Sequence, residues 1–513
     1  MVLYSYSMAL SIVLLAIYAL RKLFRGVRIL GNTPGLRVPV APISLIAPLF
    51  PCCWINPGLE WHWKWRNQIY QRFGSECLSM VPFLFGPAFL YTSSVEVAQQ
   101  ILANPIFQKS AQFVTPVSQY GSNLFTTNGS EWKRHRRIMG PAFTAETYAM
   151  VWDETASVYH EMCAAEGWDT MKVVDIPIVN DITMKVALTV LTRCAYGQHL
   201  PWNISEGAID VHQLAEALII VSESFLERFI LPSWAFKLPI PHFRKVEAAY
   251  QVLTRHMNGL IQEYCVGDTV EANRRCDVFS LLLEAREREG KLSMSDSEIM
   301  GNTFFVLWAG HETMSHIWDA TMGLLALHDD IQEEMYAEII QVSRETDSSL
   351  NFAQASKLNK ILCCFLEAGR LYPAGYLLMR QATEATVLTT YDADGPNGSI
   401  ALEAGANVCI DMIGMHYNPR HFPQPEEYRP SRWFGVSESE LSLFSLGPRA
   451  CIGRKFAMTE ACCFLSLLLK DWKLEIVLNE GETRSQWRSR VMQPKVNMTF
   501  GVGDMPIRLV KRI

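Results

Sequence analysis

Residues 444–453 read Phe444-Ser445-Leu446-Gly447-Pro448-Arg449-Ala450-Cys451-Ile452-Gly453. A glycine-containing turn can aim backbone N–H groups at the Cys451 sulfur, and a helix beginning just after it adds a dipole that favours an anion. Phe444 can shield the sulfur from water, and Arg449 is a suitable partner for a carboxylate. Gly453 lets the backbone pass close to a flat ligand. The stretch therefore predicts that Cys451 is the thiolate ligand of a metal held in a flat cofactor.

This segment resembles the haem-binding loop of the cytochrome P450 family, whose pattern Phe-x-x-Gly-x-Arg-x-Cys-x-Gly it fills at every fixed position. The resemblance implies a haem b with iron bound axially by Cys451 and cofactor-binding residues at Phe444, Gly447, Arg449 and Gly453. The alternative is an ordinary buried cysteine ahead of a helix, which is the better interpretation for each of the other twelve cysteines.

Glu367 and Arg370 stand three residues apart, where two side chains meet on one helix face. Such a pair is usually a solvated surface pair. It also resembles the Glu-x-x-Arg motif of the family, and Pro425-Glu-Glu-Tyr-Arg-Pro-Ser-Arg-Trp433 resembles the segment that supplies a third member. The resemblance implies that Glu367, Arg370 and Arg432 form a buried structural charge network beneath the haem loop.

The segment Trp132-Lys-Arg-His-Arg136 resembles the Trp-x-x-x-Arg helix of the family. Trp132 and Arg136 are one turn apart, so both side chains can reach the same haem propionate. Arg380 is a further propionate candidate.

The segment Ala309-Gly-His-Glu-Thr313 resembles the helix that crosses the distal face of the haem. The resemblance implies catalytic roles for Thr313 and Glu312 in delivering protons during oxygen activation, with Glu312 linked to solvent through water. Ala309 and Gly310 would leave room for the ligand, and the Thr313 hydroxyl can bond backwards along the helix. The alternative is a core helix with incidental polar residues.

A zinc-protease motif is excluded at the same place. His311 and Glu312 are followed by a second histidine, His316, five residues after the first instead of four. At about 100° per residue the two imidazoles point roughly 140° apart, so they cannot share a metal from one helix face.

Helical patterns dominate from Glu131 to about Val342, and short β-like runs lie between Tyr70 and Leu102. A capping box at Ser295–Glu298 predicts a helix to about Leu327, roughly 45 Å long. Further helices are expected from Asp329, over 356–371 and over 452–469, with strands over 385–390 and 406–411 and a turn at 394–398. The expected fold class is mainly α with a minor β-sheet, the cytochrome P450 fold, with a single N-terminal transmembrane helix.

An almost unbroken apolar run covers Val2–Leu20 and is followed by Arg21, Lys22, Arg25 and Arg28. About 20 apolar residues suffice to cross a bilayer, and basic residues after the run place the rest of the chain on the cytoplasmic side. A cleaved signal peptide is the alternative, but its basic residues would precede the run. We therefore expect an anchor over residues 1–22 in the endoplasmic reticulum membrane, a basic and Pro-rich linker over 23–51, and a cytoplasmic catalytic domain over 52–513. Sequons at Asn128, Asn203, Asn397 and Asn497 should then stay unglycosylated.

Composition is consistent with this organisation. Hydrophobic residues make up 49% of the chain and charged residues 19%, which is typical of a globular protein. The net charge of −6 argues against a nucleic-acid partner. The thirteen cysteines contain no CxxC unit, so neither a zinc ribbon nor a disulfide framework is indicated, and a reducing compartment is favoured.

The function that the resemblance implies is a haem monooxygenase that uses O2 and electrons from NADPH, through the NADPH-cytochrome P450 reductase, to oxidise an apolar small molecule. The chain looks most like fungal members of secondary metabolism, with a terpenoid as the first expectation for substrate. A fatty-acid or xenobiotic hydroxylase is the alternative, and a non-catalytic haem-binding sensor is the alternative from another class. Lys133, Arg134, Arg137, Arg454 and Lys455 would form the basic surface for the reductase.

Substrate contacts are expected from four less regular segments rich in Phe, Leu, Ile and Tyr. They are 107–125, 219–236, 374–378 and 491–494. The apolar run Phe229–Phe236 either dips into the bilayer or is ordinary core.

Overall fold

The computed structural model describes residues 2–44, 46–47, 51–200, 202, 211–266, 277–288, 290–345, 350–437, 442–496 and 499–512. Of the predicted sequons, Asn203 and Asn497 lie outside these residues. The chain divides into two compact units. Unit 1 consists of Met1–Phe113, Gly375–Glu427 and Leu446–Arg449, and unit 2 of Val114–Ala374, Tyr428–Ser445 and Ala450–Ile513. Helices predominate over strands, which confirms the expected mainly α class with minor sheets.

Unit 1 is built around a six-stranded sheet with the strand order β1-β2-β3-β9-β6-β4. Its strands are β1 (Gly35–Val40), β2 (Cys77–Phe85), β3 (Phe89–Thr92), β4 (Phe107–Gln108), β6 (Leu377–Ala382) and β9 (Asn407–Asp411). β9 lies inside the sheet, parallel to β3 and antiparallel to β6, and all five of its residues are buried. Burial on both faces explains its continuous apolar run Val408-Cys409-Ile410.

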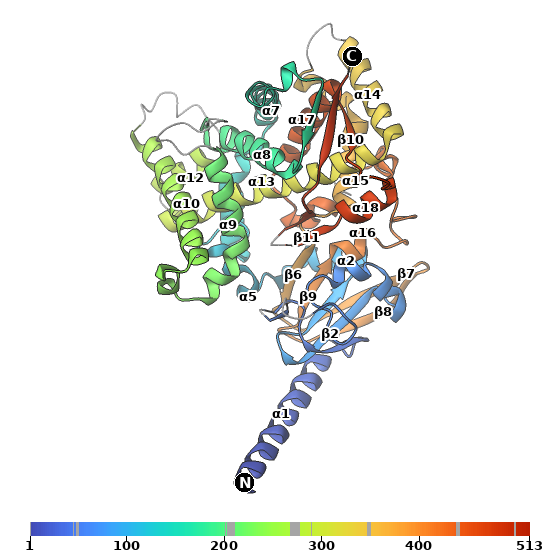
Figure 1. Ribbon diagram of the computed structural model, residues 1–513. Helices are drawn as coiled ribbons and strands as arrows, with labels where there is room; N and C mark the ends of the chain where they lie inside the picture. The colour runs from blue at the N-terminus through green and yellow to red at the C-terminus, as the bar shows by residue number, and fades with distance from the viewer. Residues whose placement is uncertain are drawn as a thin grey trace. The chain divides into compact units, whose positions relative to one another are not determined.

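A hairpin of β7 (Thr386–Asp392) and β8 (Gly395–Leu402) forms a separate two-stranded sheet in unit 1 (Figure 1). Asp392 pairs with Gly395, so the connecting loop is Ala393-Asp394 alone. The turn predicted over 394–398 is therefore mostly the first part of β8. Gly395 has φ +122°, a conformation open to glycine, and this lets the strand begin directly after a two-residue loop.

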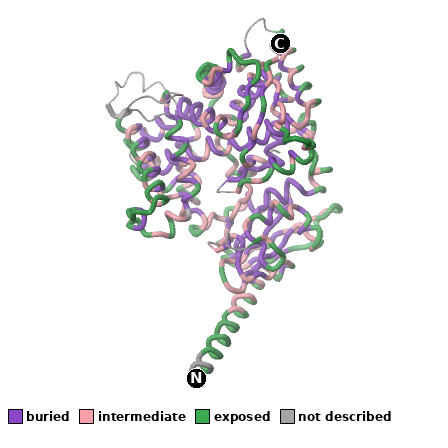
Figure 2. The backbone as a smooth tube through the Cα atoms, in the orientation of Figure 1, coloured by how far each residue is buried: buried purple, intermediate pink, exposed green. Residues whose placement is uncertain are grey.

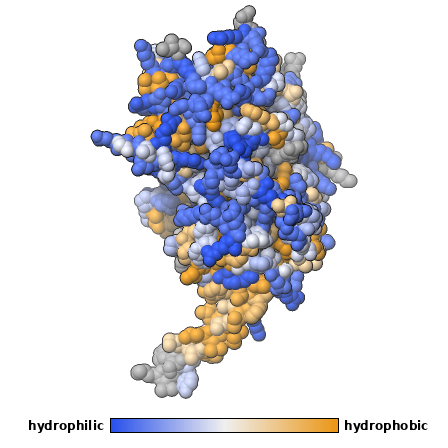
Figure 3. Space-filling model, turned by 90° about the vertical axis from the view of Figure 1, so that its right-hand side faces the viewer, coloured by the Kyte–Doolittle hydropathy of each residue, from blue (hydrophilic) through white to orange (hydrophobic). Residues whose placement is uncertain are grey.

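The first helix, α1 (Val2–Ile29), continues past the expected anchor boundary at residue 22. The expected linker is also partly regular structure, because Gly35–Val40 pairs in parallel with β2 as β1. Hydrophobic side chains cover α1 in Figure 3, and those from Leu10 to Leu20 are mostly exposed. No helix within the described ranges is both long and apolar enough to cross a membrane. The transmembrane anchor therefore stays a prediction.

Unit 1 also contains short helices, and one short helix follows where the chain passes into unit 2. They are α2 (Trp61–Trp65), α3 (Gln68–Phe73), α4 (Val95–Ala103) and α16 (Met412–His416), followed by α5 (Ala111–Val114).

Unit 2 is organised around α13 (Asp296–Leu327), which is buried along most of its length (Figure 2). Ser295 caps this helix together with Glu298, and both reciprocal hydrogen bonds of the predicted capping box are present. α13 packs against α8 (Val179–Tyr196), α15 (Asn359–Leu371) and α17 (Arg454–Asp471). α15 ends two residues before Pro373, which cannot continue a helix.

The remaining elements of unit 2 surround these helices. They are α6 (Gly129–Met139), α7 (Ala145–Ala165), α9 (Val211–Ile230), α10 (Pro241–Val266), α12 (Val278–Glu287), α14 (Asp329–Arg344) and α18 (Arg484–Val491), a sheet of β10 (Trp472–Ile476), β13 (Ile507–Lys511) and β5 (Val173–Ile176), and a hairpin of β11 (Pro494–Val496) and β12 (Phe500–Val502).

Candidate active site

Cys451 lies three residues before the first residue of α17, at the end of a loop that turns back on itself. The Cys451 N–H donates to the Phe444 carbonyl across 2.9 Å, and the Phe444 side chain is buried. Among the described cysteines only Cys451 and Cys53 are exposed, while most of the others are buried. Cys451 therefore differs from the buried cysteines in that the residue is exposed.

The surroundings of the Cys451 thiol combine close protein packing with positive charge. Its side chain is accessible, yet protein atoms surround it closely enough for burial to raise the pKa of the thiol. The Gly453 N–H and the charges of Arg136 and Arg454 act in the opposite direction and favour the thiolate. A metal ion bound to the sulfur would add to this effect and hold the group deprotonated.

The two glycines of the loop have different reasons to be glycine. Gly447 has φ +73°, and a Cβ there would come within 3.2 Å of the Leu102 carbonyl oxygen at the end of α4. Gly453 has an ordinary φ of −85°, and a Cβ on it would meet no protein atom within 4 Å. Neither backbone conformation nor protein packing requires a glycine at 453, so the position fits a flat ligand that passes close to the backbone.

Helix α6 brings Arg136 to the cysteine loop. The Arg136 guanidinium donates to the Ala450 carbonyl across 3.3 Å, and burial lowers the pKa of Arg136 while Cys451 raises it. The orientation of α6 is fixed by buried His135, whose ring contacts Asn302 and Glu298 of α13. The predicted neighbour Trp132 is half-buried against the main core of unit 2.

The predicted charge network on α15 is confirmed. Arg370 donates two hydrogen bonds of 2.9 Å to the Glu367 carboxylate, and both side chains are fully buried. Arg432 adds a third bond of 3.1 Å. The Arg429 backbone N–H at 3.0 Å and the Trp433 indole at 2.9 Å complete the shell. Trp433 was not assigned a role from sequence, although it stands in the quoted segment beside Arg432.

Unit 1 contains three cations that interact with one another. Burial and the charges of Arg380 and Arg449 hold the pKa of Lys109 well below its ordinary value. Burial also lowers the pKa of Arg380 and of Arg449 to about 10. Like charges brought together in this way fit an anionic ligand, and the two propionates of a haem are of that kind. Lys109 has no local sequence signal and was missed.

The residues of α13 that were predicted to lie on the distal face of the haem differ in their contacts. The Thr313 hydroxyl donates to the Ala309 carbonyl across 2.8 Å, which confirms the backward hydrogen bond. Thr313 and Ala309 are half-buried. Gly310 faces α8 instead, because a Cβ there would come within 2.8 Å of the Leu191 side chain. Helix packing is thus one reason for a glycine here, and room for the ligand at Gly310 stays a prediction.

Glu312 is buried and held by side chains from distant parts of unit 2. Its carboxylate accepts hydrogen bonds from the Thr499 hydroxyl at 2.7 Å and the Ser222 hydroxyl at 3.1 Å, and His316 lies 3.9 Å away. Burial raises the pKa of Glu312, but His316 and Thr499 outweigh burial and the pKa lies below its ordinary value. Glu312 is therefore an anion in a polar network, and sequence reasoning missed the partners that hold it.

An apolar surface is formed by α13 together with neighbouring segments of unit 2. Partly buried hydrophobic side chains pack against the main core of unit 2 without being enclosed by it. They include Phe125, Ile220, Phe305, Val306, Ala309 and Ile452. Phe125 and Phe305 stack with ring centroids 5.8 Å apart. Apolar surface left accessible beside Thr313 fits a hydrophobic substrate.

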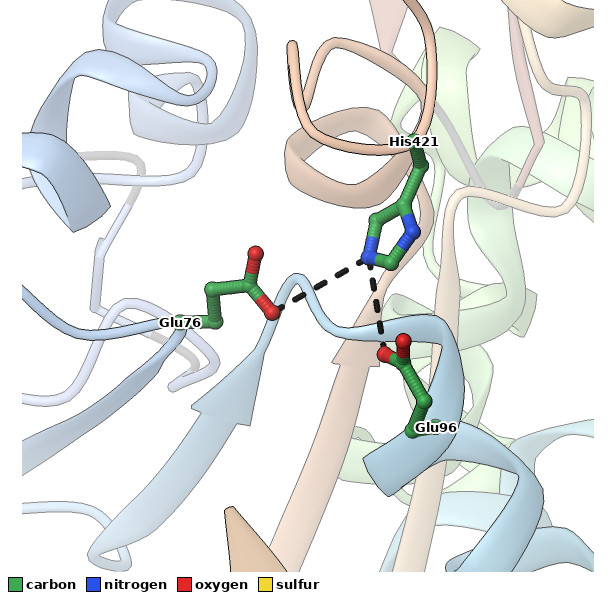
Figure 4. Close-up of side chains that lie close together, drawn as sticks. All are labelled: Glu76, Glu96 and His421. Carbon is green, nitrogen blue, oxygen red and sulfur yellow. Dashed lines mark ion pairs between the residues drawn. The ribbon is translucent and has the colours of Figure 1, made fainter. Parts of the chain in front are cut away.

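A second group of ionisable side chains lies in unit 1. Glu76, Glu96 and His421 approach one another closely enough for their donor atoms to lie within 4.8 Å (Figure 4). Arg420 already donates to both carboxylates at 2.6 Å, and this hydrogen bond lowers the pKa of Glu96 to about 2. The guanidinium already pairs with both carboxylates, so we assign the group to an ion-pair network and not to a metal centre.

Comparisons with known proteins agree with this geometry. The family model described as "Cytochrome P450" matches residues 67–501. Cytochrome P450 monooxygenase 124 of Postia placenta is 32% identical over 98% of this chain and 99% of its own length. Cyclooctat-9-en-7-ol 5-monooxygenase of Streptomyces melanosporofaciens is 27% identical over 78% of this chain and 83% of its own. The crystal structure of the cytochrome P450DA heme domain superimposes with a TM-score of 0.72 at 20% identity, covering 94% of this chain and 99% of that one.

Proposed function

Because the chain belongs to the cytochrome P450 family, whose members are haem-thiolate monooxygenases, we propose that it oxidises an apolar small molecule with electrons that NADPH supplies through the NADPH-cytochrome P450 reductase. The overall reaction is RH + O2 + NADPH + H⁺ giving ROH + NADP⁺ + H2O. When bound, the haem supplies the activation of dioxygen. The observation that carries the proposal is the accessible Cys451 thiol, set between Arg136 and Arg454 at the start of α17.

The residues of this chain have separate roles in the proposal. Cys451 holds the iron. Within unit 1, Lys109, Arg380 and Arg449 are the cations that suit carboxylates such as the propionates. Thr313 and Glu312 supply protons during turnover, because an alcohol and an adjacent carboxylate can hold and pass a proton in a site kept otherwise dry. The Glu367 network fixes the segment that precedes the cysteine loop and takes no part in the chemistry.

The substrate class is inferred from the apolar surface and from one relative. Phe125, Phe305 and Val306 offer hydrophobic contact beside Thr313. The name of the Streptomyces relative describes oxygenation of cyclooctat-9-en-7-ol at position 5. Together they favour a secondary metabolite such as a terpenoid over a fatty acid or a xenobiotic. The buried Glu312 beside Thr313 argues against a non-catalytic haem sensor, because a sensor has no use for a proton donor there.

The reductase would approach a basic surface formed by α6 and the start of α17. Lys133, Arg137 and Lys455 are exposed. Arg134 is removed from the predicted set, because it forms an ion pair with Glu298. Exposed lysine and arginine steer an acidic partner at low ionic strength. Electron transfer from the reductase should therefore slow as salt rises, and Lys133→Glu should slow it further.

Membrane attachment in the endoplasmic reticulum is proposed from the apolar side chains of α1 and the basic residues Arg21, Lys22, Arg25 and Arg28 that come after them. In unit 2, exposed Phe229, Trp234 and Ile240 give a second apolar surface that fits contact with lipid. Translation into microsomes tests the topology. The Asn128 and Asn397 sequons should remain unglycosylated if the catalytic part is cytoplasmic, and glycan on either would overturn that orientation.

The proposed activity is tested with purified protein, reductase and NADPH. The reduced carbon monoxide complex should show the thiolate absorption band, and NADPH oxidation should require the reductase. Cys451→Ala should abolish the band, whereas Cys53→Ser, a change at another exposed cysteine, should leave it intact. Retention of the band in Cys451→Ala would overturn the assignment of the ligand. The substrate is identified by comparing metabolites of cells with and without the protein.

A further inference from the structure

Three ionisable residues lie in a row along a single face of α13. Glu312, His316 and Asp319 occupy positions i, i+4 and i+7, which bring side chains onto one stripe of a helix. All three are buried, with exposed fractions of 5%, 6% and 1%. Burying three such groups costs free energy unless they are paired or used. The haem resemblance assigns a role to Glu312 only.

His316 stands in the middle of this row with one ring nitrogen toward Glu312. Its Nε2 lies 3.9 Å from Glu312 Oε1, a separation that a small ring rotation or one bridging water closes. Its Nδ1 is buried and has no hydrogen-bond partner among the residues that the structure describes. The ring packs against the backbone at Gly501, where a Cβ would come within 2.4 Å of Nδ1. A buried ring nitrogen without a hydrogen bond costs free energy, so an imidazole kept here needs a reason.

Asp319 connects the row to the start of α8. Its carboxylate accepts hydrogen bonds from the Thr183 hydroxyl and the Asn180 amide, both at 2.7 Å. Asn180 is half-buried and the next residue, Asp181, is exposed, so the row reaches solvent at this end. Burial raises the pKa of Asp319 to about 6, while His316 opposes the rise and Asp181 adds to it. The carboxyl can therefore hold or release a proton near neutral pH.

Building on the proposed monooxygenase function, we propose that Asp319, His316 and Glu312 form a proton-transfer chain that runs from the solvent-exposed start of α8 to the turn of α13 that carries Thr313. His316 and Asp319 act through Glu312 and are positioning residues. The two ring nitrogens of an imidazole make it suited to this task, because one accepts a proton while the other releases one.

The transfer is balanced at each step. A proton from solvent binds the Asp319 carboxylate, passes to His316, and the imidazole releases its other proton to Glu312. Glu312 returns to a carboxylate when it passes the proton towards the Thr313 hydroxyl. No electrons move and no bond to carbon changes. Asp319 and Glu312 end as carboxylates, whereas His316 ends with its proton on the other ring nitrogen, so the imidazole must return to its starting tautomer before the next transfer. The protons are those that the reaction consumes together with dioxygen and NADPH.

Few other charged groups lie next to Glu312, His316 and Asp319 among the described residues. His311 is the other ionisable neighbour on α13 and interacts with both Glu312 and His316, and burial lowers its pKa. From α8 the contacts are Asn180, Thr183 and the charge of Asp181. From α9 and the residues before β12 the contacts are the uncharged Ser222 and Thr499.

The first test measures the protonation of the Asp319 carboxyl group in the absence of turnover. Infrared spectra of the resting ferric protein should show a carboxyl band that grows as pH falls through about 6 and is absent in Asp319→Asn. His316→Gln should raise the midpoint of this titration, because His316 lowers the pKa of Asp319. Glu460, whose pKa burial raises well above its ordinary value, gives a constant reference band. A midpoint unchanged in His316→Gln would overturn the coupling between the two groups.

The second test follows dioxygen in the reductase-supported protein without added substrate. Hydrogen peroxide needs two protons per dioxygen, whereas two waters need four, so a slower proton supply shifts the products towards peroxide. Asp319→Asn and His316→Gln should each reduce the share of water on the order of tenfold and enlarge the solvent deuterium isotope effect on NADPH oxidation. The double variant should add little, because both residues serve one path.

His256→Gln is the matched control, since His256 of α10 is equally buried and lies outside the row. It should leave both the water share and the isotope effect unchanged. Unchanged product ratios in Asp319→Asn and His316→Gln would overturn the proton chain, as would an equal effect of His256→Gln. If the wild-type protein showed no thiolate band, the proposed function would be wrong. The infrared measurement of the coupling between His316 and Asp319 does not depend on that result.

Discussion

Thr499 donates a hydrogen bond from its hydroxyl to the Glu312 carboxylate across 2.7 Å, although 187 residues separate the two along the chain. Ser222 donates to the same carboxylate from α9. The acid beside Thr313 is thus oriented by two segments that the local motif does not contain.

Thr499→Val should destabilise the protein by about 1.5–3 kcal/mol, because it removes a hydrogen bond to a buried charge. The pKa of Glu312 should rise, since Thr499 is one of the groups that lower it. Urea denaturation at neutral pH measures the loss. Thr321→Val is the control, because the Thr321 hydroxyl donates to the Ile317 carbonyl of its own helix and, within the described residues, to no distant segment. Equal losses in the two variants would show that Thr499 does not serve Glu312.

Glu367→Gln should cost about 3–5 kcal/mol of unfolding free energy, because it removes the buried carboxylate that accepts hydrogen bonds from Arg370 and Arg432. Asp175→Asn breaks the exposed pair with Arg508 and should cost under about 1 kcal/mol. Both are measured by urea denaturation of the haem-loaded protein. A loss of similar size in both variants would mean that the Glu367 network contributes no more than a surface pair.

Cys451 should be alkylated in haem-depleted protein and protected when haem is restored, because the cofactor covers the exposed sulfur. Mass spectrometry of peptides after iodoacetamide treatment measures both states, with Cys53 as the exposed thiol that haem leaves reactive. Arg454→Gln should slow alkylation of Cys451, since losing a nearby positive charge raises the pKa of the thiol. Equal labelling of Cys451 with and without haem would contradict its assignment as the ligand.

Haem affinity should weaken as pH rises, because of Lys109. Its pKa is depressed in the free protein, so the amine loses its proton on the alkaline side earlier than an ordinary lysine. A bound propionate favours the charged form, so binding takes up a proton and is opposed at higher pH. Lys109→Met should lower haem affinity about tenfold at neutral pH and flatten its pH dependence. Spectroscopic haem titration checks this, and an unaltered pH dependence in Lys109→Met would exclude the role.

Asp319→Asn should change how stability depends on pH. The carboxyl pKa is near its ordinary value in the unfolded chain and about 6 in the folded protein, so folding is favoured while the group is protonated. The stabilisation is fully present below the unfolded pKa and is lost as pH rises through about 6, at most about 3 kcal/mol at roughly 1.4 kcal/mol per unit of pKa. Denaturation between pH 4 and pH 7 should show this loss in the wild type and a flatter profile in the variant, and an identical slope in both would contradict it.

Much of the proximal side could be predicted from residues close together in sequence. The loop from Phe444 to Gly453 contains the turn glycine, the sulfur and the helix start within ten positions, so their contacts are set by local geometry. Glu367 and Arg370 meet because three residues separate them on one helix. The capping box at Ser295 and Glu298 fixed the start of α13 in the same way.

Other features depended on how distant segments pack. Lys109 carries no local pattern, and only the fold of unit 1 brings it to Arg380 and Arg449. At Gly310 we expected space for a ligand. The close approach of Leu191 from α8 is a further reason why this position has no side chain. The sequence pattern of one segment does not show which of its faces another helix will cover. The covered face is decided by complementary packing of whole surfaces.

The family and the helix that bears Thr313 could be predicted from the sequence alone, as could the proposed cysteine ligand, since each rests on spacings of a few residues along one element. The surroundings of Glu312 became visible only in the fold of unit 2. Ser222, Thr499 and the row through His316 to Asp319 and α8 are assembled from separate parts of unit 2. The physical reason is that side-chain spacing on one helix is set by backbone geometry, whereas the partners of a buried charge are chosen by the segments that enclose it.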